Sequence, residues 1–300
     1  MKKPLISLIL CLTLLIFAVP GVQAAAFHDI ADAETSVAAA TLQGLGVVSG
    51  TPDGSFQPNG TLTRAQVCVM AVNNETGVCQ PIKEIASLCK QAGVLCFADC
   101  VQAYPHQKIN ARELGVDMLS ISSHKISGPK GVGALYIRSG VKIERLVGGG
   151  EQERGLRGGT LNTPAIVGFG EAVRILEETR ARKEEQIRAV SEQFLKGLDG
   201  VEYSINGEGE ERIPAILNLH FAGVPNASLL YRADLEGLMI SAGSACASAS
   251  VKPSHVLTAM GLDDEVAKEC VRVSFGEYNT LDEAKRGASL LKELVSLLRK

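Results

Sequence analysis

Hydrophobic and polar positions divide the chain into three stretches of different character. The first carries a long apolar run, Leu5–Val19, behind two lysines. The second, from Phe27 to Met70, has short apolar groups separated by turns rich in glycine, proline and aspartate. From about residue 72 onward, apolar runs of strand length alternate with segments of helical periodicity. This pattern predicts an α/β fold preceded by two segments of other kinds.

The first 25 residues are typical of a signal peptide. Pro20 follows the apolar run, and Val22-Gln23-Ala24 forms a small-residue ending that suits cleavage near Ala24 or Ala25. An uncleaved anchor helix is the alternative, but the run is short for a membrane span. We therefore predict that the protein is exported after removal of residues 1–25.

Residues 26–71 predict a small helical module. A helix around Val37–Leu45, a turn at Pro52-Asp53-Gly54 and a second helix that opens at Thr61 surround the loop GTPDGSFQPNG. The stretch resembles one S-layer homology repeat, through the residues FHDI and LGVVSGTPDGSFQPNGTLTRAQ. That resemblance implies a cell-surface module that binds cell-wall polymers. An ordinary helical hairpin with a turn-rich loop is the alternative.

The remaining chain predicts helices and strands in alternation. PIKEIASLCKQAG indicates an amphipathic helix that ends at Gly93, and VLCFAD, VDMLSIS and VGALYIR indicate buried strands. Such alternation favours a parallel, doubly wound sheet, in which ligands bind at the carboxyl ends of the strands. The polar residues that follow the apolar runs are therefore candidate site residues: Asn74, Asp99, Gln102, Ser122, His124 and Lys125.

Three of these residues meet the chemical needs of pyridoxal phosphate. A lysine such as Lys125 at a dry strand end can have a depressed pKa and, as the free amine, form a Schiff base with an aldehyde. Asp99 at a neighbouring strand end can bind a protonated pyridine nitrogen. Ser122 and the glycine-rich turn after it supply donors for a phosphate. Each residue alone is more often a solvated or capping group, so the prediction depends on their joint occurrence.

From about Val72 to Lys300 the sequence resembles a cysteine desulfurase of the NifS type, a class V member of the fold-type I pyridoxal phosphate enzymes. The segments that carry the resemblance occur in family order: VNNETG, ADCVQA, SSHKISGPKGVGALYIR, GGGEQERGLRGGTLNTPAIVG, SAGSACASASVKPSHVLTAMG and RVSFGEYNT. The resemblance implies part of a large cofactor-binding domain over residues 72–180 and a small α+β domain over residues 181–300. A selenocysteine lyase-like enzyme of the same class is a close alternative.

The resemblance also implies roles for individual residues around the cofactor. Lys125 matches the lysine that forms the Schiff base and moves protons, and His124 matches a histidine near the cofactor. Asp99 matches the partner of the pyridine nitrogen. Gln102 and Asn74 match side chains that contact the ring hydroxyl and the substrate region.

Four further residues complete the implied site. Ser122 matches a phosphate ligand, and Thr160 matches a phosphate ligand that the other subunit of a homodimer supplies. Arg272 matches the arginine that binds the substrate carboxylate, a task that suits a bidentate guanidinium. Cys246, among small residues in AGSACASAS, matches the nucleophile that takes sulfur from L-cysteine and leaves L-alanine. A small buried thiol is the structural alternative for Cys246.

Composition and charge limit the other partners. The chain has 300 residues, of which 46% are hydrophobic and 21% charged, which is typical of a globular protein. Its net charge of -3 and the lack of a basic stripe argue against nucleic acid as a partner. The eight cysteines show no CxxC or CxxH spacing, so we predict no metal site. Most of them resemble thiols of a protein made in a reducing compartment, in conflict with the predicted export.

The carboxyl-terminal part contains scaffold elements. The charged segment AIVGFGEAVRILEETRARKEEQIRAVSEQFLKGL predicts the long helix that joins the two domains in the family, and IPAILNLHFAG predicts a strand. Thr280 and Glu283 form a capping-box pattern for a last helix. His220 and His255 are interpreted as structural.

Two features depart from the family pattern. Glu277 follows SFG, where many members have arginine. The family's opening strand, its GATE-like phosphate loop and a ring-stacking histidine precede the position of Asn74, whereas the signal segment and the repeat stand there in this chain. Weakened cofactor binding is therefore expected, and an exported surface protein with an inert desulfurase portion is the alternative function.

The family also suggests partners that bear on the location of the protein. Its usual sulfur acceptor is a scaffold protein for iron–sulfur cluster assembly. Because that scaffold is cytoplasmic, as the desulfurases normally are, it conflicts with the predicted export.

Overall fold

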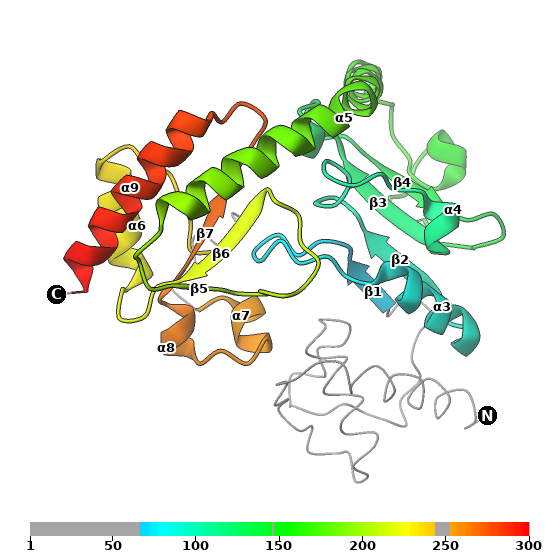
Figure 1. Cartoon of the computed structure of the whole chain (residues 1–300). Helices are drawn as coiled ribbons and strands as arrows, with labels where there is room; N and C mark the ends of the chain where they lie inside the picture. The colour runs from blue at the N-terminus through cyan, green and yellow to red at the C-terminus, as the bar shows by residue number, and fades with distance from the viewer. Residues whose placement is uncertain (1–66, 146, 244–252, 300) are drawn as a thin grey trace, which may run out of the picture. The chain divides into compact units, whose positions relative to one another are not determined.

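The computed structural model describes residues 67–145, 147–243 and 253–299, which belong to two compact units (Figure 1). The first unit comprises residues 67–71 and 81–180, and the second comprises residues 72–80 and 181–299. The long helix α5 (Thr163–Gly197) belongs to the first unit as far as Arg180 and to the second from Ala181 onward. The predicted signal peptide, nearly all of the predicted repeat and Cys246 lie outside the described residues.

A four-stranded sheet organises the first unit. Its order is β1 (Val67–Met70), β2 (Cys96–Asp99), β3 (Met118–Ser122) and β4 (Gly133–Ile137). The first three strands are parallel, and β4 is antiparallel to β3. The short helices of this unit are α4 (Ala111–Leu114), η1 (Ser123–Ile126) and η2 (Gln152–Gly155). The parallel strands and the intervening helices confirm the predicted α/β fold.

Helix α3 (Ile82–Ala92) follows the sequence pattern closely. Its buried residues Ile82, Ala86 and Cys89 share one face. Gly93 ends the helix in the left-handed conformation, φ 68°, and its N–H donates to the Lys90 carbonyl at 3.2 Å. The predicted helix and its end at Gly93 are therefore confirmed.

The structure departs from the predicted strands in two places. The sequence pattern predicts no strand at residues 67–70, which form β1 and pair with β2. The apolar and β-branched run VCVM suits a strand. The strand β4 is not buried, since Leu135 is 49% exposed, and it is not parallel. Only residues 123–132 connect β3 to β4, which is too short for a parallel crossover.

A buried aspartate aligns three of these strands. Asp117 is 8% exposed and accepts from the Cys96 backbone N–H through Oδ2 at 2.8 Å and from Arg138 Nε through Oδ1 at 2.7 Å. Its carbonyl also accepts from the Arg138 N–H at 2.8 Å. Because Cys96 begins β2 and Arg138 follows β4, one side chain sets the register around β3.

A separate apolar cluster supports the first unit beneath the end of β3. Ile126 of η1 packs there with three buried residues from the first half of α5: Phe169, Ala172 and Leu176. The position of η1, and with it the chain that follows β3, therefore depends on the long helix.

The second unit is built on a three-stranded antiparallel sheet, β5 (Ser204–Ile205), β6 (Ile216–His220) and β7 (Cys270–Ser274). Its core joins β6 and β7 with the second half of α5 and with α6 (Asn226–Leu235) and α9 (Leu281–Leu298). The helices α7 (His255–Ala259) and α8 (Asp264–Ala267) complete the unit. Thr280 and Glu283 form the predicted capping box of α9. Buried core residues include Phe194, Leu198, Leu217, Leu219, Phe221, Leu229, Val271 and Leu291.

The segment 72–80 packs against β6 in the second unit. Leu217 and Leu219 belong to the helical core, whereas Asn218 donates through Nδ2 to the Glu75 carbonyl at 3.3 Å. Gly77, with φ 77°, lies beside Ile216. Alternate residues of β6 thus contact different layers, as a pleated strand requires.

None of the helices described here is both long and apolar enough to cross a lipid bilayer.

We expect Gly77→Ala to destabilise the second unit more than Gly209→Ala. Both glycines have positive φ, so either substitution costs about 1 kcal/mol of backbone strain. A Cβ at position 77 would also lie 2.8 Å from the Ile216 carbonyl oxygen, whereas one at position 209 meets nothing within 4 Å. The expected loss for Gly77→Ala is about 3 kcal/mol in urea unfolding. Equal losses in the two variants would contradict this close packing.

Candidate active site

Predicted site residues follow adjacent parallel strands in the first unit. Asp99 is the last residue of β2 and pairs in register with Ser120 of β3. Ser122 is the last residue of β3, and His124 and Lys125 lie in η1 directly after it. The parallel register brings the carboxyl ends of β2 and β3 to one edge of the sheet, where this fold class binds ligands.

The side chains of Lys125 and Gln102 meet at this edge. Lys125 Nζ donates to Gln102 Oε1 at 3.2 Å, although the two residues are 23 positions apart. The sequence places Lys125 at a dry strand end, but the structure shows its side chain exposed to solvent. Lys125 forms no ion pair with another residue of the described part, so its amine is not held by a carboxylate there.

Ser122 and His124 form a second contact. Ser122 Oγ and His124 Nδ1 lie 2.7 Å apart in a hydrogen bond. This contact leaves His124 Nε2 as the ring nitrogen that remains for a ligand. A hydroxyl and an imidazole at one strand end can both donate to a phosphate.

Asp99 supplies negative charge to the same region. Its Oδ1 accepts from the Val101 backbone N–H at 2.9 Å, so the carboxylate is bonded locally and lies half-buried. Burial raises the pKa of the neighbouring Cys100 thiol to about 12, and the charge of Asp99 adds to the increase. The carboxylate of Asp99 is a suitable partner for a positively charged group.

These side chains fit pyridoxal phosphate by type and by strand position. Lys125 offers an amine for the aldehyde, Asp99 a carboxylate for the pyridine nitrogen, and Ser122 and His124 donors for the phosphate. Thr160 is exposed in the segment between η2 and α5, and its predicted role across a dimer stays a prediction. Within the described ranges, no group of three or more His, Cys, Asp or Glu side chains could hold a metal ion.

The predicted substrate residues lie in the second unit. Arg272, on β7, donates through Nη1 to the Asn74 carbonyl at 3.1 Å, so it is the backbone of Asn74 that it contacts. Arg272 Nε is buried and has no hydrogen-bond partner among the described residues. Burial lowers the pKa of this guanidinium, and the charge of Glu75 opposes that shift. An unsatisfied, buried guanidinium nitrogen is suited to receive an anionic ligand.

Glu75 is a residue whose importance the sequence does not reveal. It belongs to the quoted motif VNNETG, but an acid in an asparagine-rich turn is ordinarily exposed, and no pattern marks this one as buried. The structure shows it 1% exposed.

Glu277, which stands where many family members have arginine, forms an ion pair. Its Oε2 lies 2.7 Å from Lys183 Nζ.

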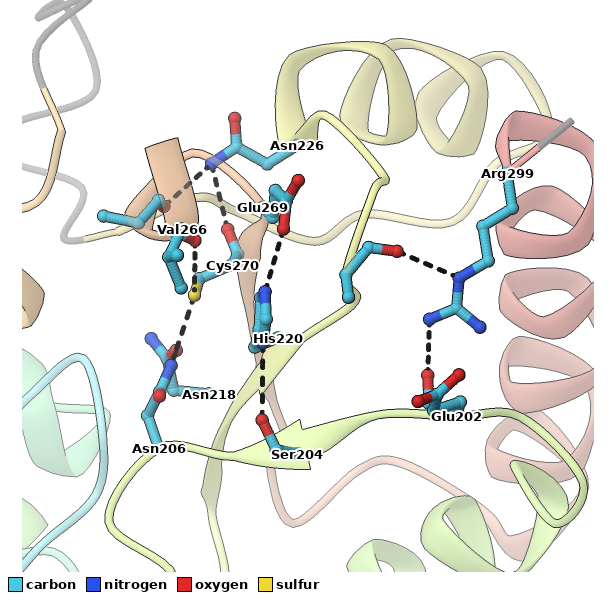
Figure 2. Close-up of polar contacts among 12 residues, drawn as sticks. Glu202, Ser204, Asn206, Asn218, His220, Asn226, Val266, Glu269, Cys270 and Arg299 are labelled. Atoms are coloured by element: carbon cyan, nitrogen blue, oxygen red, sulfur yellow. Dashed lines mark hydrogen bonds and ion pairs between the residues drawn. The ribbon is translucent and has the colours of Figure 1, made fainter. Parts of the chain in front are cut away.

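His220 lies in a polar network that connects the sheet to the segment before β7 (Figure 2). Its Nδ1 lies 3.4 Å from Ser204 Oγ and its Nε2 lies 2.9 Å from Glu269 Oε2. Asn226 donates to the Cys270 carbonyl at 3.0 Å in the same region. These contacts link β5, β6, α6 and β7, which agrees with the structural role assigned to His220.

Two family models match the sequence. The model "Aminotransferase class-V" matches residues 57–286, and the model "S-layer homology domain" matches residues 27–68. The first extends over most of the described residues, including every candidate in both units.

Named relatives and solved structures agree with the first model. The chain is 44% identical over 236 residues to the mitochondrial cysteine desulfurase of Saccharomyces cerevisiae, covering 78% of this chain and 47% of that protein. It is 41% identical to the cysteine desulfurase IscS of Clostridium botulinum, covering 78% and 60%. A NifS-like protein from Rickettsia africae superposes with a TM-score of 0.70 at 30% identity, covering 77% of this chain and 61% of that chain. The chain thus spans about half to three-fifths of the length of these proteins.

Because the folded state raises the pKa of Cys100, the free energy of unfolding should fall as pH rises. The thiol ionises near pH 9 in the unfolded chain but near 12 in the folded one. Its stabilising contribution is therefore complete below pH 9 and is lost toward pH 12, by up to about 1.4 kcal/mol per pH unit. Denaturant unfolding from pH 8 to 11 should show a shallower decline for Cys100→Ala. An unchanged slope would contradict the buried, neutral thiol.

Proposed function

The chain belongs to the class-V aminotransferase family, and we propose that it is a pyridoxal phosphate-dependent cysteine desulfurase. The observation that carries the proposal is the contact of Lys125 with Gln102. It lies at the carboxyl ends of the parallel strands, where Asp99 is the last residue of β2. In the net reaction, L-cysteine and the thiol of Cys246 give L-alanine and a persulfide on Cys246. The sulfur leaves the substrate carbon and bonds to Cys246 Sγ, and the thiol proton balances the alanine product.

Residues of the first unit would hold the cofactor. Lys125 Nζ would bind its aldehyde group and carry a proton, and Gln102 orients this amine through Oε1. Asp99 would pair with the pyridine nitrogen, and Ser122 and His124 would donate to the phosphate. When bound, pyridoxal phosphate supplies an electron sink that weakens bonds at the substrate α-carbon.

Residues of the second unit bind the amino acid. Arg272 receives the substrate carboxylate, and its buried Nε, which has no partner in the described part of the chain, is a donor for that carboxylate. Asn74 borders the same guanidinium through its backbone carbonyl. Cys246 takes the sulfur. The names of the relatives support cysteine as the substrate, and a comparison of cysteine with selenocysteine separates this proposal from a lyase-like enzyme.

Partners and location form a further part of the proposal. The S-layer homology match over residues 27–68 indicates an association with the cell surface, which we propose occurs through a cell-wall polymer after export. A second copy of the chain supplies Thr160 to the phosphate site. A thiol of a sulfur-acceptor or iron–sulfur scaffold protein receives the outer sulfur of the persulfide, which returns Cys246 to the thiol. The same match favours a second candidate function, a surface protein whose desulfurase portion is inert.

Lys125→Ala should abolish a visible absorption band that forms when the full chain is mixed with pyridoxal phosphate, because the amine at that position attaches the aldehyde. Lys130→Ala, a lysine five positions further along the same unit, is the matched control and should retain the band. Equal bands in all three proteins would contradict the assignment of Lys125. No band in any of them, together with retention on purified wall polymer, would favour the surface function.

Arg272→Lys should raise KM for L-cysteine about 10-fold to 100-fold with a smaller change in kcat, because an ammonium cannot reproduce the bidentate contact of a guanidinium. Sulfide release in the presence of a thiol reductant measures both constants. Cys246→Ala should release no sulfide yet retain the Lys125-dependent band. Turnover that persists in Cys246→Ala would exclude that thiol as the sulfur acceptor.

A further inference from the structure

Glu75 combines a charged side chain with nearly complete burial in the second unit, at 1% exposure. Burial of a carboxylate costs several kcal/mol unless hydrogen bonds or nearby positive charge compensate for the lost water. The contacts of Glu75 therefore indicate what this carboxylate holds in place.

The backbone around Glu75 is tightly bonded. Asn73 Oδ1 accepts from the N–H groups of Glu75 at 2.9 Å and of Thr76 at 3.0 Å, and Gly77 N–H donates to the Asn73 carbonyl at 2.9 Å. Asn218 of β6 donates to the Glu75 carbonyl. These bonds attach the turn to the sheet and fix the backbone from which the Glu75 side chain extends.

The carboxylate binds the start of α7. Ser254 Oγ donates to Glu75 Oε2 at 2.5 Å across 179 positions of sequence. The same Oγ accepts from the N–H groups of Val256 at 3.2 Å and Leu257 at 3.3 Å, so it also caps α7. Glu75 therefore orients the residue that begins this helix.

Gly243 lies against the same carboxylate. A Cβ built on Gly243 would lie 3.5 Å from Glu75 Oε2. In sequence, Gly243 stands just before residues 244–252 and Ser254 just after them, and Cys246 belongs to that interval. Residues on both flanks of the interval thus lie close to the Glu75 side chain.

Arg272 is the positive charge near this carboxylate. Its backbone pairs with Ser241, N–H to carbonyl at 2.5 Å in one direction and 3.1 Å in the other, and its Nη1 bonds the carbonyl of Asn74 beside Glu75. Arg272 forms no ion pair within the described ranges. The negative charge of Glu75 therefore stabilises the charged guanidinium at a distance, without a direct contact. A direct ion pair would occupy the guanidinium, whereas a carboxylate held back by Ser254 leaves donors free for a ligand.

We propose that Glu75 is a positioning residue for substrate binding: its buried carboxylate anchors α7 through Ser254 and compensates the charge of Arg272 without occupying it. The Glu75 side chain thereby lies close to Gly243 and Ser254, which flank the interval with Cys246, and near Arg272, which is proposed to bind the substrate. The proposal rests on the function proposed above for the roles of Arg272 and Cys246, but the anchoring contact itself does not require turnover.

Hydrogen exchange on the full chain tests the anchor without cofactor or substrate. Glu75→Ala should make peptide amides in residues 254–262 exchange about 10-fold faster. Glu75→Gln should restore protection, because an amide oxygen can still accept from Ser254. Glu277→Ala, which removes a carboxylate paired with Lys183 in the same unit, should leave these amides unchanged. Parent-like exchange in Glu75→Ala would overturn the anchor, and Ser254→Ala tests the same contact should Glu75→Ala not fold.

Steady-state kinetics test whether the negative charge of Glu75 supports substrate binding by Arg272. Both Glu75→Ala and Glu75→Gln should raise KM for L-cysteine about 10-fold with kcat within about 3-fold, since both remove the charge beside Arg272. A normal KM in Glu75→Gln would overturn the electrostatic part, because a purely structural hydrogen bond would be rescued by glutamine. If the parent protein releases no sulfide, the proposed function fails, and hydrogen exchange alone decides whether Glu75 is an anchor.

Discussion

The alignment of the first unit depends on the buried carboxylate of Asp117. Its two oxygens and its backbone connect the start of β2, the start of β3 and the residue after β4. Because β2 and β3 are aligned from this point, Asp99 and Ser122 end their strands at the same edge of the sheet. The contact of Lys125 with Gln102 depends on that alignment, because local structure alone would not bring the two side chains together.

Glu75 has a comparable place in the second unit. Both carboxylates are buried and both bond groups distant in sequence. Glu75 lies next to Asn74, whereas Asp117 lies at the start of the strands that end at Asp99 and Ser122. Burial in low dielectric makes such groups costly when unsatisfied, so each tolerates few alternative arrangements of its neighbours. We infer that buried carboxylates provide the positional precision of the site, while the apolar cores of the two units provide most of their stability.

The family similarity and the geometry support each other in different ways. The matched family supports the chemistry proposed for Lys125, Asp99 and Arg272, and the structure shows what surrounds these groups in this chain. Strand β1 illustrates the gain from structure. The region that matches the S-layer homology model ends at residue 68, inside β1, yet β1 pairs with β2 as part of the same sheet as the cofactor residues. The two matched regions overlap over residues 57–68.

The sequence by itself determined the features that neighbouring residues control: the end of α3 at Gly93, the capping box at Thr280, the apolar runs of β2 and β3, and the motifs that show the family. Only the tertiary structure decided the direction and exposure of β4, the strand at residues 67–70, the solvent exposure of Lys125 and the burial of Glu75. The physical reason is the range of the interactions. Caps and periodicity act over a few residues, whereas burial and strand pairing depend on partners as distant as Ser254 is from Glu75, 179 positions along the chain.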